Sequence, residues 1–216
     1  MKNIIITIIA LFIVTSFIVY AQDNYLCTKE VASIKEQKFD NDKWQRCVAF
    51  HGHSCPGVAT GFRVAEAVVE KLHVTFSEDE ELVCVTENDA CAPDSIQALL
   101  GCTFGKGNFI FRNTGKRVFN FFNRKTGEKL RIYYKYKSKK MSGKMSKEEK
   151  QLQTEYILNA PLDELFDFSQ PKFEVPEESC IFGNIDCELC GETAPEHKIR
   201  IQYGKKVCLD CFKGKW

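Results

Sequence analysis

An apolar run dominates the N-terminus of the chain. Residues 4–20 are hydrophobic apart from Thr and Ser positions, with a single Lys before them and Val19 and Ala21 at the end. This pattern is typical of a signal peptide with a small-residue cleavage position. An uncleaved membrane anchor is the alternative, and a buried core helix fits less well because no polar face interrupts the run. We therefore expect residues 1–21 to give an extracytoplasmic location, secreted or anchored, with a cytoplasmic location as the alternative.

Two amphipathic helices separated by a tight turn are predicted next. Either Asn41 or Asp42 can cap the first helix, whose apolar positions recur at helical spacing and place His51 on the inward face. Residues 55–57 form a turn, and apolar residues spaced by three and four predict a second helix that ends near Leu72. The sequence therefore predicts a helix, a tight loop rich in His and Cys, and a second helix.

A sheet is predicted after these helices. A short strand with β-branched residues covers residues 82–86, and a helix follows in which Pro93 occupies the first turn and Gly101 ends the last. With Thr-Gly pairs at the two turns between them, three further strands are expected over residues 108–113, 117–123 and 128–137. We expect these three strands to form an antiparallel meander.

The following stretch is basic. Residues 124–150 contain eleven Lys or Arg against three Asp or Glu, with Tyr interleaved. A patch for RNA, anionic lipid or an acidic partner is one interpretation, and a solvated strand face with a flexible linker is the one we favour. Ser146 followed by Glu149 is a capping box that begins a helix. A short helix is expected over residues 161–166, and residues 171–176 are expected to be an extended linker.

Composition adds one anomaly to an otherwise ordinary globular chain. Of 216 residues, 44% are hydrophobic and 27% are charged, which fits one main domain with a full core. The net charge of +1 gives no global attraction to nucleic acid or to a membrane surface. Eleven cysteines are unusual, and in so long a chain they favour metal ligation over a disulfide framework. Cys27, Cys47 and Cys180 stay unassigned, with a disulfide among them as an alternative in an oxidising compartment.

Two Cys-x-x-Cys motifs near the C-terminus predict a structural zinc site. Seventeen residues separate Cys187 and Cys190 from Cys208 and Cys211, the spacing of a four-cysteine zinc ribbon or treble-clef knuckle. So short a segment lacks a core, and metal binding would supply its folding energy. A thioredoxin-like redox pair and two disulfides are the alternatives, and zinc is favoured over both. Four protein ligands leave no position for a substrate, so we expect a role in docking or dimer support.

A second set of candidate metal ligands lies between the predicted helices. His and Cys bind borderline-soft metals, and residues distant in sequence can join in one site. The candidates are His51, His53, Cys55, Cys91 and Cys102. Cys91 precedes a helix, where the positive end of the helix dipole favours the thiolate form. The loop over residues 103–107 carries two glycines that permit close approach of a ligand, although it lacks the residue order of a P-loop.

Three stretches of the sequence together resemble the E-subunit family of formylmethanofuran dehydrogenase. They are FHGHSCPGVATGFRVAEA, ENDACAPDSIQALLGCTFGKGNFIFRNTGKRVFNFFNRKTGEKLRI, and the terminal CELCGE with GKKVCLDCF. The resemblance implies an α+β core, usually paired as a dimer, with a Cys/His metal site and, in many members, a zinc-binding tail. The family is named after a subunit that accompanies a molybdenum or tungsten enzyme reducing carbon dioxide onto methanofuran. That chemistry belongs to the large pterin-bearing subunit, which nothing in this chain resembles.

The family motifs fall on the candidate ligands residue by residue. His53 and Cys55 match the HGH-x-CPG motif, Cys91 matches the acidic-loop cysteine, and Cys102 matches the Gly-Cys-Thr motif. The resemblance implies that these four are ligands, with His51 as an alternative ligand or as a hydrogen-bond donor to one. A satisfied core histidine is the other interpretation of His51, and a small buried apolar residue is the other interpretation of Cys102.

Two more residues are expected to line the same pocket. Asp94 would orient a ligand or accept a proton, and its alternative role is to stabilise the helix dipole from the first turn. Lys106 would pair with an anionic substrate or cofactor, and its alternative is a solvated side chain. Together with His51, these residues are the candidate catalytic groups.

The predicted fold class is α+β, with helices packed on an antiparallel sheet and a small four-cysteine zinc-ribbon or treble-clef domain after it. The expected divisions are residues 1–21 for the signal or anchor segment, 22–170 for the metal-binding core, and 171–216 for a linker and the ribbon.

Two functions from different classes fit these features. The preferred one is a metal-binding accessory protein that holds zinc, nickel or iron in the core and zinc in the ribbon. It would act as a homodimer with a partner redox enzyme or membrane complex. The alternative is a metal-dependent enzyme for a small carbonyl or one-carbon substrate, with Asp94 or His51 as general base and Lys106 as anion clamp. Three protein ligands would favour the enzyme and four would favour storage or structure. Nucleic-acid binding by the ribbon would need a cytosolic protein, and the export segment counts against it.

Overall fold

The computed structural model describes residues 39–135 and 145–214. The predicted signal or anchor segment, residues 1–21, lies outside these ranges, as does part of the basic stretch. None of the helices in the two described ranges is long and apolar enough to cross a membrane.

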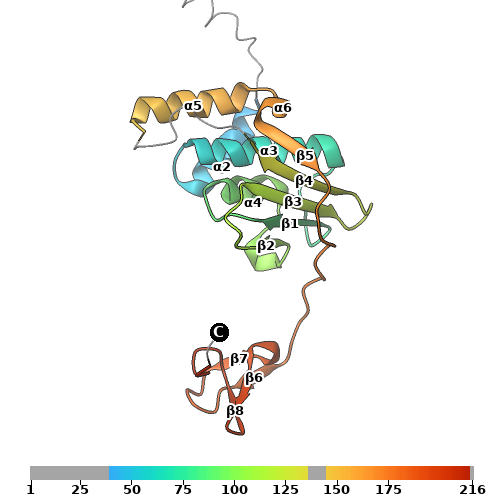
Figure 1. Ribbon diagram of the computed structural model, residues 1–216, viewed down its shortest axis with the longest axis vertical. Coiled ribbons are helices and arrows are strands. Elements are labelled where there is room, and N and C mark those ends of the chain that lie inside the picture. The colour runs from blue at the N-terminus through green and yellow to red at the C-terminus, as the bar shows by residue number, and fades with distance from the viewer. Residues whose placement is uncertain (1–38, 136–144, 215–216) are drawn as a thin grey trace, which may run out of the picture.

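A five-stranded sheet forms the centre of the main domain (Figure 1). Its strands lie in the order β2-β1-β3-β4-β5, and each neighbouring pair is antiparallel except β1 and β2. The strands are β1 (Leu82–Thr86), β2 (Phe109–Phe111), β3 (Val118–Asn123), β4 (Lys129–Tyr134) and β5 (Phe166–Ser169). β1 and β3 are buried along their whole length because they occupy the middle of the sheet.

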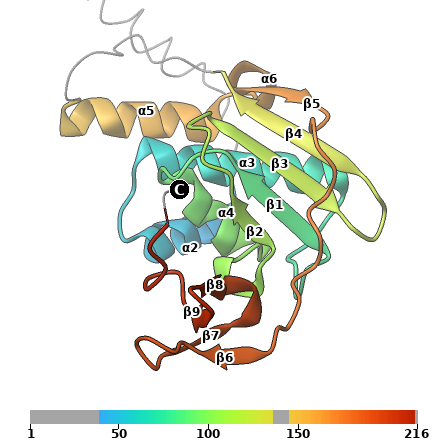
Figure 2. The same ribbon diagram turned by 60° about the horizontal axis from the view of Figure 1, so that its bottom comes forward.

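Helices cover one face of this sheet (Figure 2). The long helix α3 (Pro56–Leu72) packs against both α4 (Ala92–Leu100) and α5 (Lys147–Asn159), and α2 (Asn41–His51) packs against α4. The four-residue helix α6 (Leu162–Leu165) leads directly into β5. The N-termini of α3 and α4 and the C-terminus of α2 therefore belong to one packed layer.

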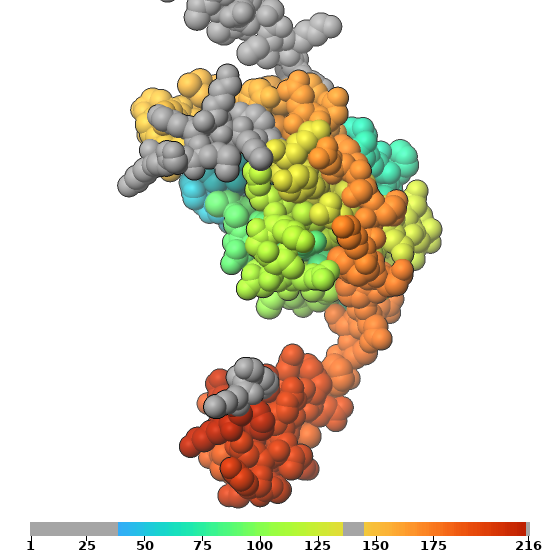
Figure 3. Space-filling model, viewed as in Figure 1, coloured from blue at the N-terminus to red at the C-terminus, as the bar shows by residue number. Residues whose placement is uncertain are grey.

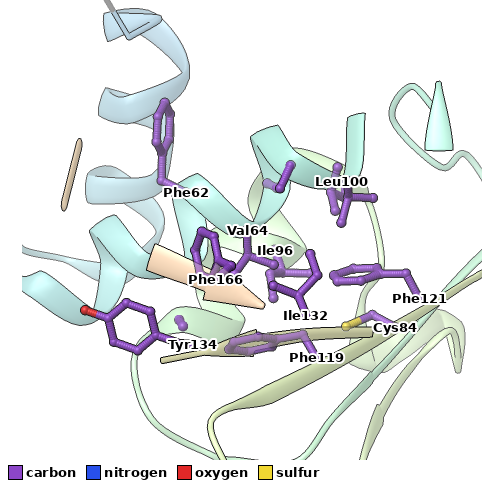
Figure 4. Packing of buried hydrophobic residues seen from close by; sticks show 14 of the residues in the cluster. Phe62, Val64, Cys84, Ile96, Leu100, Phe119, Phe121, Ile132, Tyr134 and Phe166 are labelled. Carbon is purple, nitrogen blue, oxygen red and sulfur yellow. The ribbon is translucent and has the colours of Figure 1, made fainter. Parts of the chain in front are cut away.

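The main core lies between the helices and the sheet (Figure 4). The side chains that meet there are fully or almost fully buried. Burial of each large one stabilises the folded state by about 2 kcal/mol. They include Phe62 and Val64 of α3, Ile96 and Leu100 of α4, and Phe119, Phe121, Ile132 and Phe166 of the sheet. A smaller cluster of Val83, Val85 and Phe122 lies on the opposite face of the sheet, where Ile110 and Phe173 pack against it. Both faces are therefore covered.

The prediction of an antiparallel meander is wrong for its first strand, β2. β3 and β4 pair as predicted, but β2 pairs in parallel with β1, so β1 lies between β2 and β3. Asn108 fixes this arrangement, because its carbonyl accepts from Cys84 N at 2.8 Å and its amide nitrogen donates to Leu82 O at 2.9 Å. A parallel partner arrives through the α4 crossover rather than through a hairpin, so turn residues in the sequence do not reveal it.

Helix boundaries follow local signals closely. Asp40, rather than Asn41 or Asp42, caps α2, and its carboxylate accepts from the N–H groups of Asp42 and Lys43. α4 has its proline in the first turn and ends at Gly101 in the left-handed conformation, as predicted. α5 begins with the predicted capping box at Ser146. The signals of α4 and α5 act through neighbouring backbone groups, so sequence was sufficient to find them, whereas it placed the cap of α2 one or two residues too late.

The segment after α5 differs from expectation. The short helix predicted over residues 161–166 is confined to α6, and Phe166 already belongs to β5. Phe166 and Phe168 both pack in the main core, which is the alternation expected of a strand with one buried face. The pairing partner, β4, supplies the hydrogen bonds that the local sequence does not indicate.

Residues 184–207 form a separate segment of two short hairpins. β6 (Asn184–Asp186) pairs with β7 (Thr193–Pro195), and β8 (Arg200–Gln202) pairs with β9 (Lys205–Val207). Of the apolar residues described in residues 181–214, only Cys187 and Val207 are buried. The predicted α+β class with a small four-cysteine domain after it is confirmed.

Two candidate metal centres

The first centre lies where three helix ends converge. His51 is the last residue of α2, and Gly52 ends that helix at a φ of 90°, a left-handed conformation that glycine adopts without strain. The chain then reverses through His53 to Cys55, which is the N-cap of α3. Because α4 packs against both helices, its N-terminus, with Cys91 as N-cap, reaches the same region.

Three predicted residues come together as a set of metal-ligand atoms. One ligand atom each from His51, His53 and Cys55 lies within 4.8 Å of the other two. The two imidazole rings have their centroids 4.6 Å apart. Donor atoms around a tetrahedral zinc ion lie about 3.5 Å apart, so a small contraction brings this set to bonding geometry. Both nitrogen and sulfur donors are present, which suits zinc, nickel or iron(II).

Asp94 determines which nitrogen of His51 is available. The His51 Nδ1 and Asp94 Oδ2 atoms are 2.6 Å apart, so Nδ1 carries the proton that is donated to the carboxylate. His51 Nε2 is buried and has no hydrogen-bond partner among the described residues. A buried nitrogen without a partner is costly, whereas a lone pair directed at a metal ion is satisfied. The pair therefore has the carboxylate–histidine arrangement found behind many metal ions.

Cys91 adjoins the three-residue set. A Cβ atom placed on Gly57 would lie 2.8 Å from Cys91 Cβ and 3.3 Å from its Sγ, so the thiol is packed directly against the start of α3. Burial raises the pKa of the Cys91 thiol, and the neighbouring Cys55 raises it further. The sequence predicted the opposite, a thiolate favoured by the helix dipole. In this pocket, burial and the neighbouring Cys55 outweigh the effect of the helix dipole on the pKa of Cys91.

The structure does not bring Cys102 to this set. Its side chain is fully buried in the main core, where Sγ donates to Leu82 O at 3.3 Å. Burial raises the pKa of Cys102 to about 12, so the thiol stays protonated near neutral pH. Cys84, which also lies in the core, has its thiol pKa raised by burial and by Cys102 (Figure 4). These two cysteines behave as small apolar residues.

Lys106 also has another role than the one expected. Its Nζ donates to Ser77 O at 2.7 Å and to Glu78 O at 3.3 Å, and it lies 5.7 Å from the centroid of the Phe76 ring. These contacts tie η1 (Phe104–Lys106) to the loop before β1. The ammonium group is therefore used in closing a loop, and its contacts do not include the His and Cys residues of the first centre.

One determinant of this centre was not anticipated from the sequence. Gly57 and Gly61 lie one turn apart on α3, and a Cβ atom on Gly61 would lie 2.1 Å from Ala92 O. The two glycines therefore let the N-terminus of α4 lie directly on α3. The spacing of two glycines by four residues within an amphipathic helix was the signal that could have indicated this close approach.

The second centre contains the four cysteines of the two Cys-x-x-Cys motifs. One sulfur atom each from Cys187, Cys190, Cys208 and Cys211 lies within 4.8 Å of the others, and the Cys190 and Cys208 sulfurs are 3.8 Å apart. The backbone N–H of Cys208 donates to the Cys187 sulfur at 3.3 Å. Backbone N–H groups of Cys190 and Cys208 lower the pKa of Cys187 to about 6. Four mutually close sulfurs with thiolate-stabilising donors fit a tetrahedral zinc ion.

Two family models match this chain in separate regions. The model described as "FmdE, Molybdenum formylmethanofuran dehydrogenase operon" matches residues 50–167. The model described as "Prokaryotic dksA/traR C4-type zinc finger" matches residues 181–215. The first match includes every candidate ligand of the first metal centre, and the second includes all four cysteines of the other centre.

A curated relative and a solved structure are also similar to this chain. A probable S-adenosyl-L-methionine-binding protein of Archaeoglobus fulgidus is 29% identical over 193 residues, which cover 77% of this chain and 51% of that protein. The chain thus spans about half the length of this relative. The crystal structure of a tungsten formylmethanofuran dehydrogenase FmdE-like protein from Syntrophus aciditrophicus gives a TM-score of 0.56 at 22% identity. That match covers 79% of this chain and 90% of the other, and it shows a shared fold.

Proposed function

This chain belongs to the family described as FmdE, with a four-cysteine zinc finger at its C-terminus, and from that premise we propose that it is a metal-binding accessory protein with two separate centres. The proposed ligands of the core centre are His51 Nε2, His53 and Cys55, with Cys91 beside them as a fourth. The proposed ligands of the ribbon centre are its four cysteines.

One observation carries the proposal for the core centre. His51 Nε2 is buried and unpartnered among the described residues, while Asp94 takes the proton on the opposite ring nitrogen. A core histidine kept only for packing would use both nitrogens or expose one of them. A histidine oriented by a carboxylate and flanked by His53 and Cys55 supports a metal ligand instead.

The residues present suit zinc, nickel or iron in the core. Two imidazoles and one or two thiols are borderline to soft donors, and no set of carboxylates suited to calcium or magnesium joins them among the described residues. Such an ion would supply Lewis acidity or be carried to a partner. In either case Asp94 fixes the orientation of the His51 imidazole. Cys91 is the residue that would serve as the fourth ligand of the metal ion.

A metal-dependent enzyme for a small carbonyl or one-carbon substrate is the second candidate. Its supporting observation is that only three residues of the described ranges form the compact set and that His53 lies at the surface, which leaves a side of the centre accessible. An accessible fourth position is a property of catalytic metal sites. Lys106 has no part in this candidate, because its ammonium binds the loop carbonyls.

We also propose that the protein acts on a partner redox enzyme or membrane complex, that it pairs as a homodimer, and that residues 1–21 direct its export. Exposure of His53 supports transfer or contact at the core centre, and several large apolar side chains are exposed on the ribbon. Zinc ribbons without a free coordination position suit docking rather than chemistry.

Metal content tests the proposal. We expect two metal ions per chain in protein purified without oxygen, loss of one in Cys55→Ser and loss of the other in Cys208→Ser. Cys180→Ser is the matched control, because this exposed cysteine lies outside both centres, and it should keep both ions. A Cys55→Ser protein that retains two ions would refute the core centre.

Whether a fourth protein ligand binds the metal of the core centre distinguishes the two candidate functions. Cobalt(II) bound at the core centre should show thiolate-to-metal charge-transfer absorption. If Cys91→Ser lowers its intensity by about half, two thiols bind and the closed accessory site is supported. An unchanged intensity would favour three ligands and the enzyme.

A further inference from the structure

Residues 168–180 lie between the two regions that match known families. The sequence predicted that residues 171–176 are an extended linker, and in the structure they have no helix or strand. They are nevertheless packed along the main domain. We call residues 171–179 the strap; Figure 3 shows this part of the chain in orange, running down the side of the main domain to the ribbon.

The first anchor of the strap is Phe173. Its ring centroid lies 5.6 Å from that of Phe122, and its side chain packs on the cluster that includes Val83 and Val85. The guanidinium carbon of Arg112 lies 4.9 Å from the centroid of the same ring. Phe173 therefore covers apolar side chains on the face of the sheet that the helices leave uncovered, and it gains a cation–π contact there.

The second anchor is Arg124, which joins the strap to the loop before β1. Its Nη2 donates to Pro176 O at 2.8 Å, and its Nε donates to Glu80 O at 3.1 Å. The side chain is largely buried, so these charge-assisted bonds are sheltered from water. An ion pair between Lys129 and Glu174 at 2.6 Å lies nearby, but it is exposed at Glu174 and adds little.

The third anchor is Ser179, at the end of the strap. Its backbone N–H lies 3.2 Å and 3.0 Å from the two carboxylate oxygens of Glu80, and its hydroxyl donates to Lys106 O at 3.4 Å. A Cβ atom on Gly107 would lie 1.9 Å from Ser179 Oγ, and the φ of Gly107 is 82°. Glycine is thus favoured at residue 107 by its backbone conformation, and a side chain there would also displace the Ser179 hydroxyl from the strap's last anchor.

The strap is in close contact with the main domain at these three anchors but not everywhere between them. A cavity of about 280 Å³ lies between the strap residues Val175 and Glu178 and a part of the main domain that includes Phe122 of β3 and Arg124 in the turn after it. Ile181, two residues past the last anchor, is fully exposed. The chain therefore leaves the main domain immediately after Ser179.

We propose that the outer face of the sheet is a docking surface for an extended peptide carrying one phenylalanine, and that its occupant is the chain's own strap. Docking shortens the free tether of the ribbon from residues 171–183 to residues 180–183. At full extension these spans are about 45 Å and about 14 Å. The strap thereby holds the ribbon, and the metal it binds, close to the loops that contain Glu80 and Gly107 instead of leaving it free over a wide volume.

Trypsin cleavage after the exposed Lys172 tests the docking in the whole chain. Phe173→Ala should be cut there roughly tenfold faster than wild type, because local release of the strap exposes the bond to the protease. Arg124→Gln should be cut faster as well. Glu177→Ala is the matched control, because this exposed strap residue takes no part in the three anchors, and it should be cut at the wild-type rate. Equal rates in wild type and Phe173→Ala would overturn the proposal.

A synthetic peptide of residues 170–179 tests the surface itself. It should bind the Phe173→Ala chain, whose surface is vacated, and slow its cleavage, and it should bind wild type roughly tenfold more weakly because the strap competes for the surface. The same peptide with alanine for phenylalanine is the control and should not bind. Small-angle scattering should show a larger maximum dimension for Phe173→Ala than for Glu177→Ala. Absence of peptide binding together with unchanged dimensions would show that the strap is a passive linker. Neither result depends on metal content, so this proposal and the proposed function fail separately.

Discussion

His51 and Asp94 are 43 positions apart in the chain and their side chains are 2.6 Å apart in the structure. This contact gives His51 a single tautomer and leaves Nε2 as the only ring nitrogen that can bind a cation. Cys102 illustrates the opposite outcome, because a family motif marks it while its environment is apolar and its thiol donates to a backbone carbonyl. At this scale, surroundings rather than residue type decide which His and Cys side chains can act as ligands.

Asp94→Asn should weaken metal binding at the core centre by roughly 10- to 100-fold, the usual loss when the carboxylate behind a ligating histidine is removed. The amide can still accept a hydrogen bond but no longer fixes the protonated Nδ1 electrostatically. Competition with a chromophoric chelator measures the affinity. Asp89→Asn, at an exposed position before the same helix, is the control and should bind like wild type. Equal affinity of Asp94→Asn would mean that His51 is not a ligand.

At the scale of elements, the contact between α3 and α4 positions the core centre. Gly61 allows the carbonyl of Ala92 to lie where a side chain would otherwise be, and Ala92 follows Cys91 directly. The loop before β1 has a similar role, because its backbone carbonyls accept hydrogen bonds from Lys106 and Asn108, two positions apart in the chain, and from Arg124 after β3. Short segments with many backbone acceptors thus hold the ends of longer elements in place.

Gly61→Ala should lower the free energy of unfolding by about 2 kcal/mol, since overpacking against a backbone carbonyl outweighs the helix propensity gained by alanine. The added methyl would stand 2.1 Å from Ala92 O and force α4 away from α3. Urea denaturation measures the change. Gly105→Ala is the control, because nothing lies within 4 Å of its Cβ position. A variant at residue 61 as stable as wild type would show that the two helices separate without cost.

Glu81 should make the free energy of unfolding depend on pH. Its carboxylate accepts from the N–H groups of Glu78 and Asp79 at 2.9 Å, and its own N–H and these two lower its pKa from 4.5 to about 2. Because the pKa of Glu81 is lower in the folded state than in the unfolded state, its ionised carboxylate stabilises the folded state at pH values above 4.5. This stabilisation is lost as the pH falls from 4.5 towards 2. Glu81→Gln should therefore unfold at lower urea than wild type near neutral pH, with the difference shrinking below pH 4.5.

The matched control for this pH series is Glu78→Gln, because within residues 39–135 and 145–214 the Glu78 carboxylate makes no hydrogen bond. Its urea midpoint should follow that of wild type at every pH. A constant difference between Glu81→Gln and wild type across the series would mean that the charge of Glu81 is not what stabilises the loop.

At the scale of the whole molecule, the chain consists of a core that packs around a sheet and a ribbon that packs around its cysteines. The core buries large side chains on both faces of the sheet, whereas the ribbon buries only two apolar residues in its described part. The strap connects the two through the outer face of the sheet rather than through open solvent. Stability of the two parts should therefore respond to different treatments.

Removal of metal should unfold the ribbon and leave the core folded, because metal binding is the main source of folding energy for so small a segment. After treatment with a strong chelator in oxygen-free buffer without added thiol, amides in residues 184–207 should exchange with solvent deuterium as in an unfolded chain. Amides of β1 and β3 should stay protected and serve as the internal control. A ribbon that remains protected after chelation, but loses protection on adding reductant to an untreated sample, would indicate two disulfides instead of zinc.

The local part of the site was predictable, because it depends on neighbours in the chain. The two Cys-x-x-Cys motifs, the loop from His51 to Cys55, and the placement of Cys91 before a proline-started helix all follow from residue types and spacing. The non-local part was not. Exclusion of Cys102 and Lys106, and the close approach of α4 to Gly61, depend on which surfaces face one another after packing.

Residue types and spacing alone were enough for both ends of α4, the capping box of α5, the four-cysteine motif and the α+β class, since each follows from hydrogen bonds or periodicities within a few residues. Only the tertiary structure decided that β2 lies parallel to β1, that residues 166–169 form a strand, that Asp94 orients His51, and that the strap lies on the sheet. These features join segments far apart in the chain, and their free energy comes from contacts that exist only when both segments are in place.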